Sequence, residues 1–144
     1  MPNPGDIDAA LIALLEADAP LRALLPDGVS FDKARQNSQR FVVVSLVMED
    51  DIPEFGRCAY EDALYLVKAV ALGTDGATAE LGAARIHELL EDQPLTVEGY
   101  GWMTMHRESR VRLKEPDAVD AALVWQHFGG NYRVQMAVVH GGSA

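Results

Sequence analysis

A chain of 144 residues, 49 % of them apolar, suits one globular domain, and we expect a single domain over 1–144, with an ordered core at about 6–139 and a frayed tail at 140–144. Its 22 acidic and 12 basic residues give a formal net charge of −10, which argues against nucleic-acid binding, because phosphate neutralisation supplies most of the affinity of such proteins. No apolar run approaches the roughly 18 residues that cross a bilayer, no signal-peptide pattern opens the chain, and the single cysteine excludes an internal disulfide, so we expect a soluble protein made in the cytoplasm.

The N-terminal segment predicts helical structure followed by a strand. Apolar residues recur at helical spacing over Asp6–Asp18, and Asp6 or Asp8 can cap the start of this helix. A short second helical turn follows over residues 17–25. The β-branched run Arg40–Met48 then predicts a strand that is buried on both faces.

The next segments alternate between polar and apolar character. The acidic stretch Glu49–Cys58 contains Pro53 and Gly56 and predicts a long connecting loop. Tyrosines and valines over Ala59–Leu72 predict a second long strand. Ala77–Pro94 predicts an amphipathic helix that ends at its proline.

A solvent-faced strand is predicted over residues 102–113 from its alternating pattern. One parity of this strand is mostly apolar and the other is basic; the apolar set is Met103, Met105, Val111 and Leu113, and the basic set is Arg110 and Arg112. With Arg107 and Lys114 nearby, this gives a basic row that either contacts acids of a neighbouring copy or is simply solvated.

The closing stretch WQHFGGNYRV, residues 125–134, has two possible geometries. In a hairpin with a turn at Gly129–Gly130, Phe128 pairs with Asn131. In one long strand with a glycine bulge, Phe128 instead joins the face of Tyr132 and Val134. Because strands come in consecutive pairs, the fold class is α+β: a mixed, largely antiparallel sheet of four to five strands, with one long and one short helical segment packed on it.

Several groups that could carry chemistry have simpler interpretations. His87 lacks the second histidine of a zinc-protease helix, because Glu91 occupies that position. Two acidic groups lack calcium-loop spacing and are interpreted as solvated; they are Glu115, Asp117 and Asp120, and Asp50, Asp51 and Glu54. Cys58 could form a nucleophile–base pair with His106 or His127, but a lone cysteine is more often a small residue that fills the core. We therefore predict no catalytic residue, no metal site and no cofactor.

The order of these pieces, from Asp6 to Val139, resembles the tail-terminator (tail-completion) proteins of long-tailed bacteriophages. The N-terminal helix, the RFVVVSL strand and the single amphipathic helix contribute to the resemblance. Its most specific part is a closing W-x-H-x-G-G-x-Y-x-V pattern, a structural signature that marks no catalytic residue. The pattern is met at Trp125, His127, Gly129, Gly130, Tyr132 and Val134.

The resemblance implies a homo-hexameric ring that caps the tail tube and stops its polymerisation. The expected partners are further copies of the chain, the tail-tube protein and the head–tail connector or stopper protein, while DNA passes through the lumen without specific binding. It implies a virion location in the tail or neck, assembly in the host cytoplasm, a mixed sheet flanked by helices, no enzymatic activity and no membrane contact.

Two sets of residues are the candidates for these contacts. The subunit interface is expected at Arg107, Arg110 and Arg112, opposite acidic loops of a neighbour. The surface for the tail tube is expected in the acidic loop, at Asp50, Asp51, Ile52, Glu54 and Phe55. Two alternatives stay open: a neck stopper or adaptor ring on the head side, and a small enzyme with a His–carboxylate or His–Cys site.

Overall fold

The computed structural model describes residues 3–54 and 57–139, apart from the side chains at 53, 54, 57–59 and 103. Its helices and strands follow one another as α1 (Pro4–Glu16), α2 (Ala19–Leu24), β1 (Val29–Phe31), β2 (Arg40–Glu54), β3 (Arg57–Gly73), α3 (Ala77–Leu90), β4 (Tyr100–Pro116) and β5 (Val124–Val138). Within this part of the chain, the helices are too short or too polar to cross a membrane.

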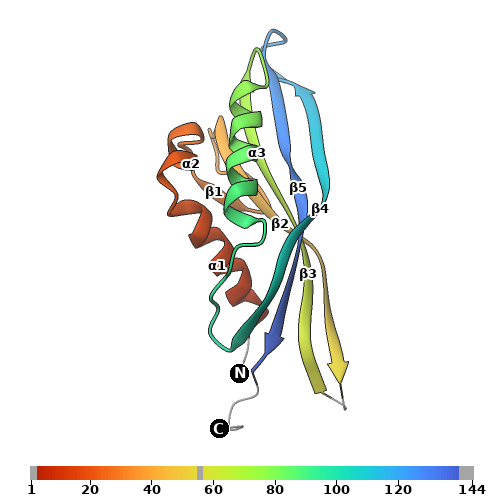
Figure 1. The fold of residues 1–144 in the computed structure, drawn as a ribbon. Helices are drawn as coiled ribbons and strands as arrows, with labels where there is room; N and C mark the ends of the chain where they lie inside the picture. The colour runs from red at the N-terminus through yellow and green to blue at the C-terminus, as the bar shows by residue number, and fades with distance from the viewer. Residues whose placement is uncertain (1–2, 55–56, 140–144) are drawn as a thin grey trace.

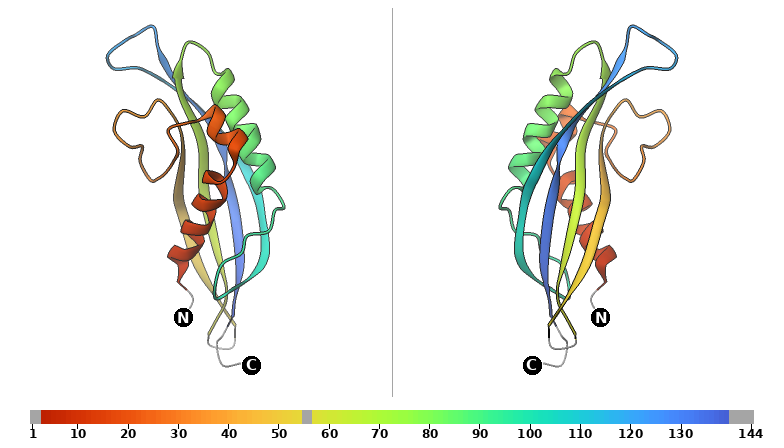
Figure 2. Two further views of the ribbon diagram at one scale, coloured as in Figure 1. Left: turned by 90° about the vertical axis from the view of Figure 1, so that its left-hand side faces the viewer. Right: turned by 90° about the vertical axis from the view of Figure 1, so that its right-hand side faces the viewer.

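The strands form one mixed sheet in the order β1-β2-β3-β5-β4, with β1 parallel to β2 and the other neighbours antiparallel. The helices lie together on one face of this sheet (Figures 1 and 2). The main core lies between the two layers and includes Leu11 of α1, Ile86 of α3 and Tyr65 of β3. This arrangement confirms the predicted α+β class.

The four longer strands, 15 to 17 residues each, give the sheet two distinct ends. The β2–β3 hairpin ends at the bottom of Figure 1, and the connection from β4 to β5 lies at the top. The helices cover the middle of the sheet between these ends. Side chains at the two ends are therefore far from each other within one molecule.

Helix α1 begins earlier than the sequence pattern predicted. The side chain of Asn3 accepts a hydrogen bond from the backbone N–H of Gly5, 3.0 Å away, and Pro4 occupies the first helical turn. Asp8 is therefore not the cap, and its carboxylate instead accepts a hydrogen bond from the Tyr65 hydroxyl. This bond ties the start of α1 to the sheet.

Helix α2 is joined to α3 by an aspartate with two functions. Asp18 caps α2 through the backbone N–H of Leu21 at 3.0 Å, and it binds Arg85 through Nε at 2.8 Å and Nη2 at 2.6 Å. The guanidinium holds the pKa of Asp18 below its ordinary value. A Cβ on Gly82 of α3 would lie 2.8 Å from Leu25 Cδ1 and 3.0 Å from Ala69 Cβ, so this glycine permits the close approach of helix and sheet.

The predicted loop Glu49–Cys58 is wrong. Strand β2 continues to Glu54 and β3 begins at Arg57, with Asp50 opposite Asp62 and Ile52 opposite Tyr60. The strand forms despite its acidic residues because its backbone pairs with β3. Register irregularities near Val47 and Pro53 accommodate the residues that fit the regular pairing poorly.

The predicted faces of β4 are also wrong in part. Its register against β5 shifts between Trp102 and Thr104 and again between Arg107 and Ser109, so an extra residue stands at each place. Each shift reverses the facing of the residues that come after it in the strand. Met105 is buried in the core beneath the helices, whereas Leu113, predicted to share its face, pairs with His127 on the other side.

The closing stretch is one strand and not a hairpin. Strand β5 pairs with β3 without a break from Val124 to Ala137, so its glycines form no bulge in that ladder, and the irregularities lie in β4 instead. Phe128 joins the face of Tyr132 and Val134, as the single-strand alternative expected.

The paired glycines of β5 leave space for both neighbouring strands. A Cβ on Gly129 would lie 2.1 Å from the backbone oxygen of Val67 in β3. A Cβ on Gly130 would lie 2.6 Å from Arg107 Cδ and 2.8 Å from the backbone oxygen of Ser109 in β4. The two glycines thus allow β5 to pack closely between its partners.

Gly129→Ala is expected to destabilise the protein by roughly 3 kcal/mol or more, because backbone atoms would have to move to admit the methyl group. The matched control is Gly101→Ala in β4, where the added Cβ would lie 3.7 Å from Ala137 Cβ, an ordinary contact. Urea unfolding of both variants measures the difference. Equal stability of the two variants would show that the close packing at Gly129 is not required.

Candidate interaction surface

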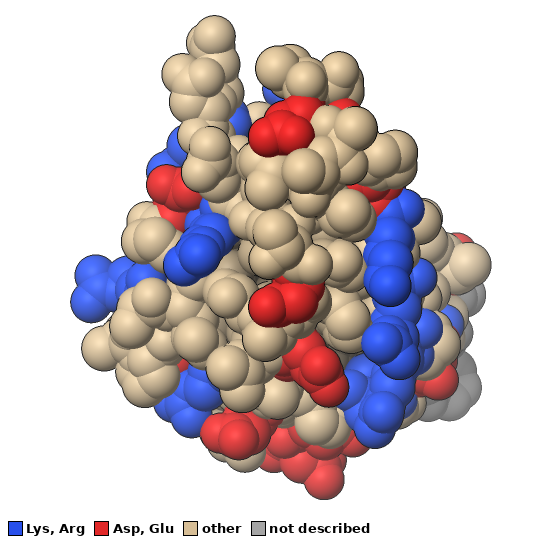
Figure 3. Space-filling view, turned by 90° about the horizontal axis from the view of Figure 1, so that it is seen from above, with Lys and Arg blue, Asp and Glu red and all other residues tan. Residues whose placement is uncertain are grey.

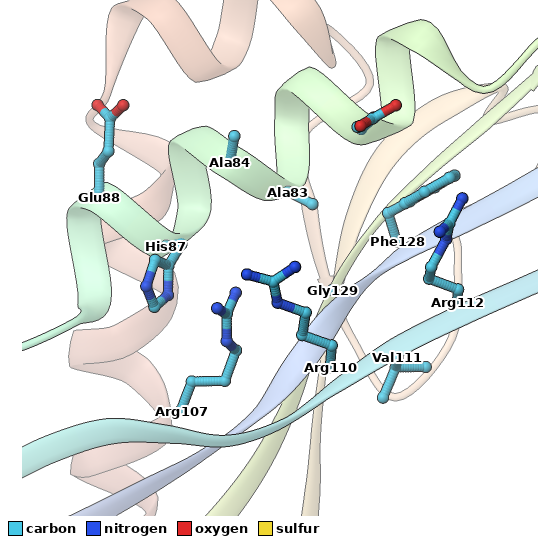
Figure 4. A pocket seen from close by; sticks show the side chains of 11 residues that line it. Ala83, Ala84, His87, Glu88, Arg107, Arg110, Val111, Arg112, Phe128 and Gly129 are labelled. Atoms are coloured by element: carbon cyan, nitrogen blue, oxygen red, sulfur yellow. The ribbon is translucent and has the colours of Figure 1, made fainter.

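A groove of about 420 Å³ lies between α3 and the β4–β5 pair. Figure 4 shows that its helix wall carries Ala83, Ala84, His87 and Glu88, and that arginines of β4 extend toward it from the opposite side. The lining includes basic, acidic and apolar side chains; those that carry the argument are His87, Glu88, Arg107, Arg110, Arg112 and Phe128.

The three arginines share this groove because of the extra residue at Glu108. Arg107 lies opposite Tyr132, Arg110 opposite Gly130 and Arg112 opposite Phe128, positions that alternate along the helix-covered face of β5. An unbroken alternation would have placed Arg107 on the other face from Arg110 and Arg112. The structure therefore brings together all the residues of the predicted basic interface.

None of these three arginines forms an ion pair within the described residues, whereas Arg85 and Arg133 do. The acids nearest to them in the groove are Glu80 and Glu88 of its lining and Glu91, which accepts a hydrogen bond from the Arg107 backbone N–H at 2.7 Å. Arg112 instead stacks over the Phe128 ring at 4.8 Å from its centroid. In Figure 3, basic side chains form a continuous band on the side where β4 lies in Figure 1.

Beneath the arginines, the floor of this region is buried and neutral. Tyr132 lies 1 % exposed, with its hydroxyl 3.0 Å from His87 Nδ1. Burial raises the pKa of Tyr132 to about 12, opposed by the charge of Arg107, so its phenol is protonated at neutral pH. From the sequence, His87 is considered only as a zinc ligand and is not predicted as a lining residue, because no spacing within the helix shows that β4 lies beside it.

A second charged group, the carboxylate cluster, lies on the same face at the other end of the sheet. It consists of Glu49, Asp51 and Glu61, whose carboxylate oxygens all come within 4.8 Å of one another. The Tyr100 hydroxyl donates a 2.7 Å hydrogen bond to Glu61. Burial, and after it the charges of Glu61, Asp8 and Asp51, raises the pKa of Glu49. Burial also raises the pKa of Glu61.

The residues predicted to contact the tail tube divide between the two faces of the β2–β3 hairpin. Asp51 belongs to the carboxylate cluster on the helix-covered face, while Asp50 and Ile52 alternate onto the opposite face. The Glu54 side chain and all of Phe55 lie outside the described residues.

The closing signature holds the fold through contacts on both faces of β5. The Trp125 indole N–H donates to Asp117 at 3.1 Å, and its ring meets Phe41 edge-on at 6.2 Å. Asp117 also accepts from the backbone N–H of Asp120 at 3.0 Å, so it builds the turn before β5. Val134 is buried in the main core.

His127 is a buried sheet residue beside a carboxylate. Its Nε2 lies 2.8 Å from a Glu115 oxygen, an ion-pair distance that is poorly aligned for a hydrogen bond, and its Nδ1 has no partner among the described residues. Burial and the charge of Lys68 lower its pKa against the opposing pull of Glu115, so the ring is neutral at pH 7.

The proposed cysteine–histidine pairs do not meet. Cys58 occupies the start of β3 opposite Pro53, whereas His127 pairs with Val70 of the same strand. The twelve intervening steps along β3 correspond to roughly 40 Å. His106 lies opposite Arg133, whose partner in β3 is Leu64, roughly 20 Å from Cys58 along the strand.

No protein-family profile and no curated protein sequence matches this chain. Its fold is similar to that of a chain in the "Virion of native gene transfer agent (GTA) particle", with a TM-score of 0.64 and 20 % identity over 91 % of this chain and 96 % of that one. A second solved structure aligns with a TM-score of 0.57 and 16 % identity over 92 % and 95 % of the two chains. Because each alignment spans nearly both chains, the likeness concerns the whole fold.

Glu49→Gln is expected to stabilise the protein at pH 7. The folded state raises the pKa of Glu49 above its unfolded value of roughly 4.3. The ionised carboxylate therefore destabilises the fold once the pH rises above that unfolded value. After solvent screening, the gain should be up to about 1 kcal/mol at pH 7 and should vanish below about pH 4.

Urea unfolding at the two pH values measures this gain. The control is Glu98→Gln, which removes an exposed carboxylate elsewhere and should change little at either pH. A loss of stability in Glu49→Gln at pH 7 would show that the ionised carboxylate makes a favourable contact.

Proposed function

We propose that this protein is a structural component of a phage-like virion, which forms a ring on the end of the tail tube, stops tube growth and joins the tail to the head connector. The observation that carries the proposal is the likeness of its fold, over 91 % of its length, to a chain of a gene transfer agent virion. The narrower proposal of a role at the end of the tail is supported by the resemblance to tail-terminator proteins, which rests on the closing signature in β5 and the order of the elements.

The charge distribution supports such a role. A formal charge of −10 keeps DNA mobile in a lumen, because like charges repel, while the arginine groove provides a local site for a protein acid. A ring also needs two different surfaces on each copy that fit one another, and this fold presents differently charged groups at its two ends.

The test is to mix the purified protein separately with tail tubes and with portal complexes. We expect co-sedimentation with the tubes and rings at their ends in negative-stain images. Binding to portals alone would favour the stopper or adaptor alternative on the head side. Binding to neither would contradict a place at the head–tail junction.

Ile52→Ser with Phe55→Ser is expected to abolish tube capping and leave the protomer folded. The physical reason is that apolar residues in an otherwise acidic stretch of the sequence are suited to burial against a partner. We expect at least a tenfold loss of co-sedimentation with an unchanged melting temperature.

The matched control is Val119→Ser, which removes a 95 % exposed apolar side chain at the opposite end of the molecule. Unfolding of the double variant would instead place Ile52 or Phe55 in the protein's own core. Equal loss of capping in Val119→Ser would mean that the effect is not specific to the hairpin.

A further inference from the structure

The arginines of the groove and the carboxylates of the cluster form no ion pair among the described side chains of one chain. This holds for Arg107, Arg110 and Arg112, and no described lysine or arginine side chain pairs with Glu49 or Asp51. Three carboxylates within 4.8 Å repel one another unless a cation or a basic group approaches. Both surfaces are therefore suited to a partner of opposite charge.

The two surfaces cannot neutralise each other inside one molecule. Arg107, the groove arginine nearest to the cluster, lies opposite Tyr132 of β5, and Glu61 lies opposite Met136, four residues further along the same strand. This separation is roughly 13 Å along the strand, beyond the roughly 8 Å over which charges act in physiological salt. An opposite charge must therefore come from another molecule.

We infer that the arginine groove of one copy receives the carboxylate-bearing side of the β2–β3 hairpin of a second copy. The occupant follows from charge complementarity: the hairpin is acidic and lies at the end of the molecule away from the groove (Figure 1). The choice of a second copy rests on the proposed function, in which copies of one chain form a closed assembly. Asp50 and Ile52, on the opposite face of the hairpin, stay available for the tail tube.

The groove has the shape and chemistry for this contact. Its volume of about 420 Å³ accommodates a few side chains, and its arginine forks suit bidentate binding of carboxylates. Glu80 and Glu88 on the helix wall limit the approach of acids to the strand side, where Arg110 and Arg112 are exposed.

Charge reversal on each surface tests the inference. The groove variant carries Arg110→Glu with Arg112→Glu, and the hairpin variant carries Glu49→Lys with Asp51→Lys. Sedimentation velocity at low salt, up to about 1 mM protein and without tail components, measures self-association of each. We expect wild type to associate and each variant to associate at least about 100-fold more weakly, because like charges would meet at the contact.

Mixing the two variants should restore association, because the glutamates of one then meet the lysines of the other and the unchanged surfaces also match. A chain that carries all four substitutions should associate by itself. The control is Arg22→Glu with Lys33→Glu, which changes the net charge as much as the groove variant does, at exposed positions away from both surfaces. Arg110→Gln with Arg112→Gln serves if the groove variant does not fold.

Three results would overturn the inference: a wild type that stays monomeric, variants that associate normally, or a mixture that stays apart. A closed dimer restored by mixing would support the contact and contradict a ring. Failure of tube capping with the contact intact would count against the proposed function alone.

Discussion

One extra residue in β4 determines which side chains the protein offers to its surroundings. At Glu108 the register against β5 shifts, and the arginines before and after the shift come to face α3 together. Glu108 itself turns to the other face, where it binds Arg133, which also binds Asp62 of β3. The shift thus unites a basic surface on one face and is stabilised by ion pairs on the other.

The glycines of β5 belong to the same arrangement. Gly130 lies directly opposite Arg110 and beside the shifted segment, where the Arg107 side chain and the Ser109 backbone occupy the space that a Cβ would need. The position of the arginines in β4 therefore depends on the space that the double glycine leaves in β5. A glycine pair that is compatible with a hairpin turn in the sequence is instead a point of close contact between strands, next to the residues that carry the basic charges.

The sequence predicts the fold class well because periodicity reports burial. The apolar spacing of α3 and the β-branched run of β2 are strong local signals, and the single-strand alternative for β5 places Phe128 correctly. Register shifts are decided by pairing between distant strands, so Glu108 carries no local signal and the predicted faces of β4 failed. The prediction of a loop at Glu49–Cys58 failed for a related reason, since Asp50 and Pro53 disfavour a strand locally and only pairing with β3 overrides them. The groove could not be predicted, because it forms only where α3 lies beside β4, and no residue spacing within either element predicts that packing.

The position of β4 as the last strand of the sheet has a consequence for solubility. Its 17 residues leave one row of backbone donors and acceptors without a neighbouring strand in the described sheet, the kind of edge at which chains add to one another and aggregate. Register shifts at two places and a series of charged side chains interrupt that edge. The basic residues that attract an acidic partner therefore also oppose the addition of other strands to this edge. Replacing them with apolar residues would remove a binding group and would also favour fibre-like assembly.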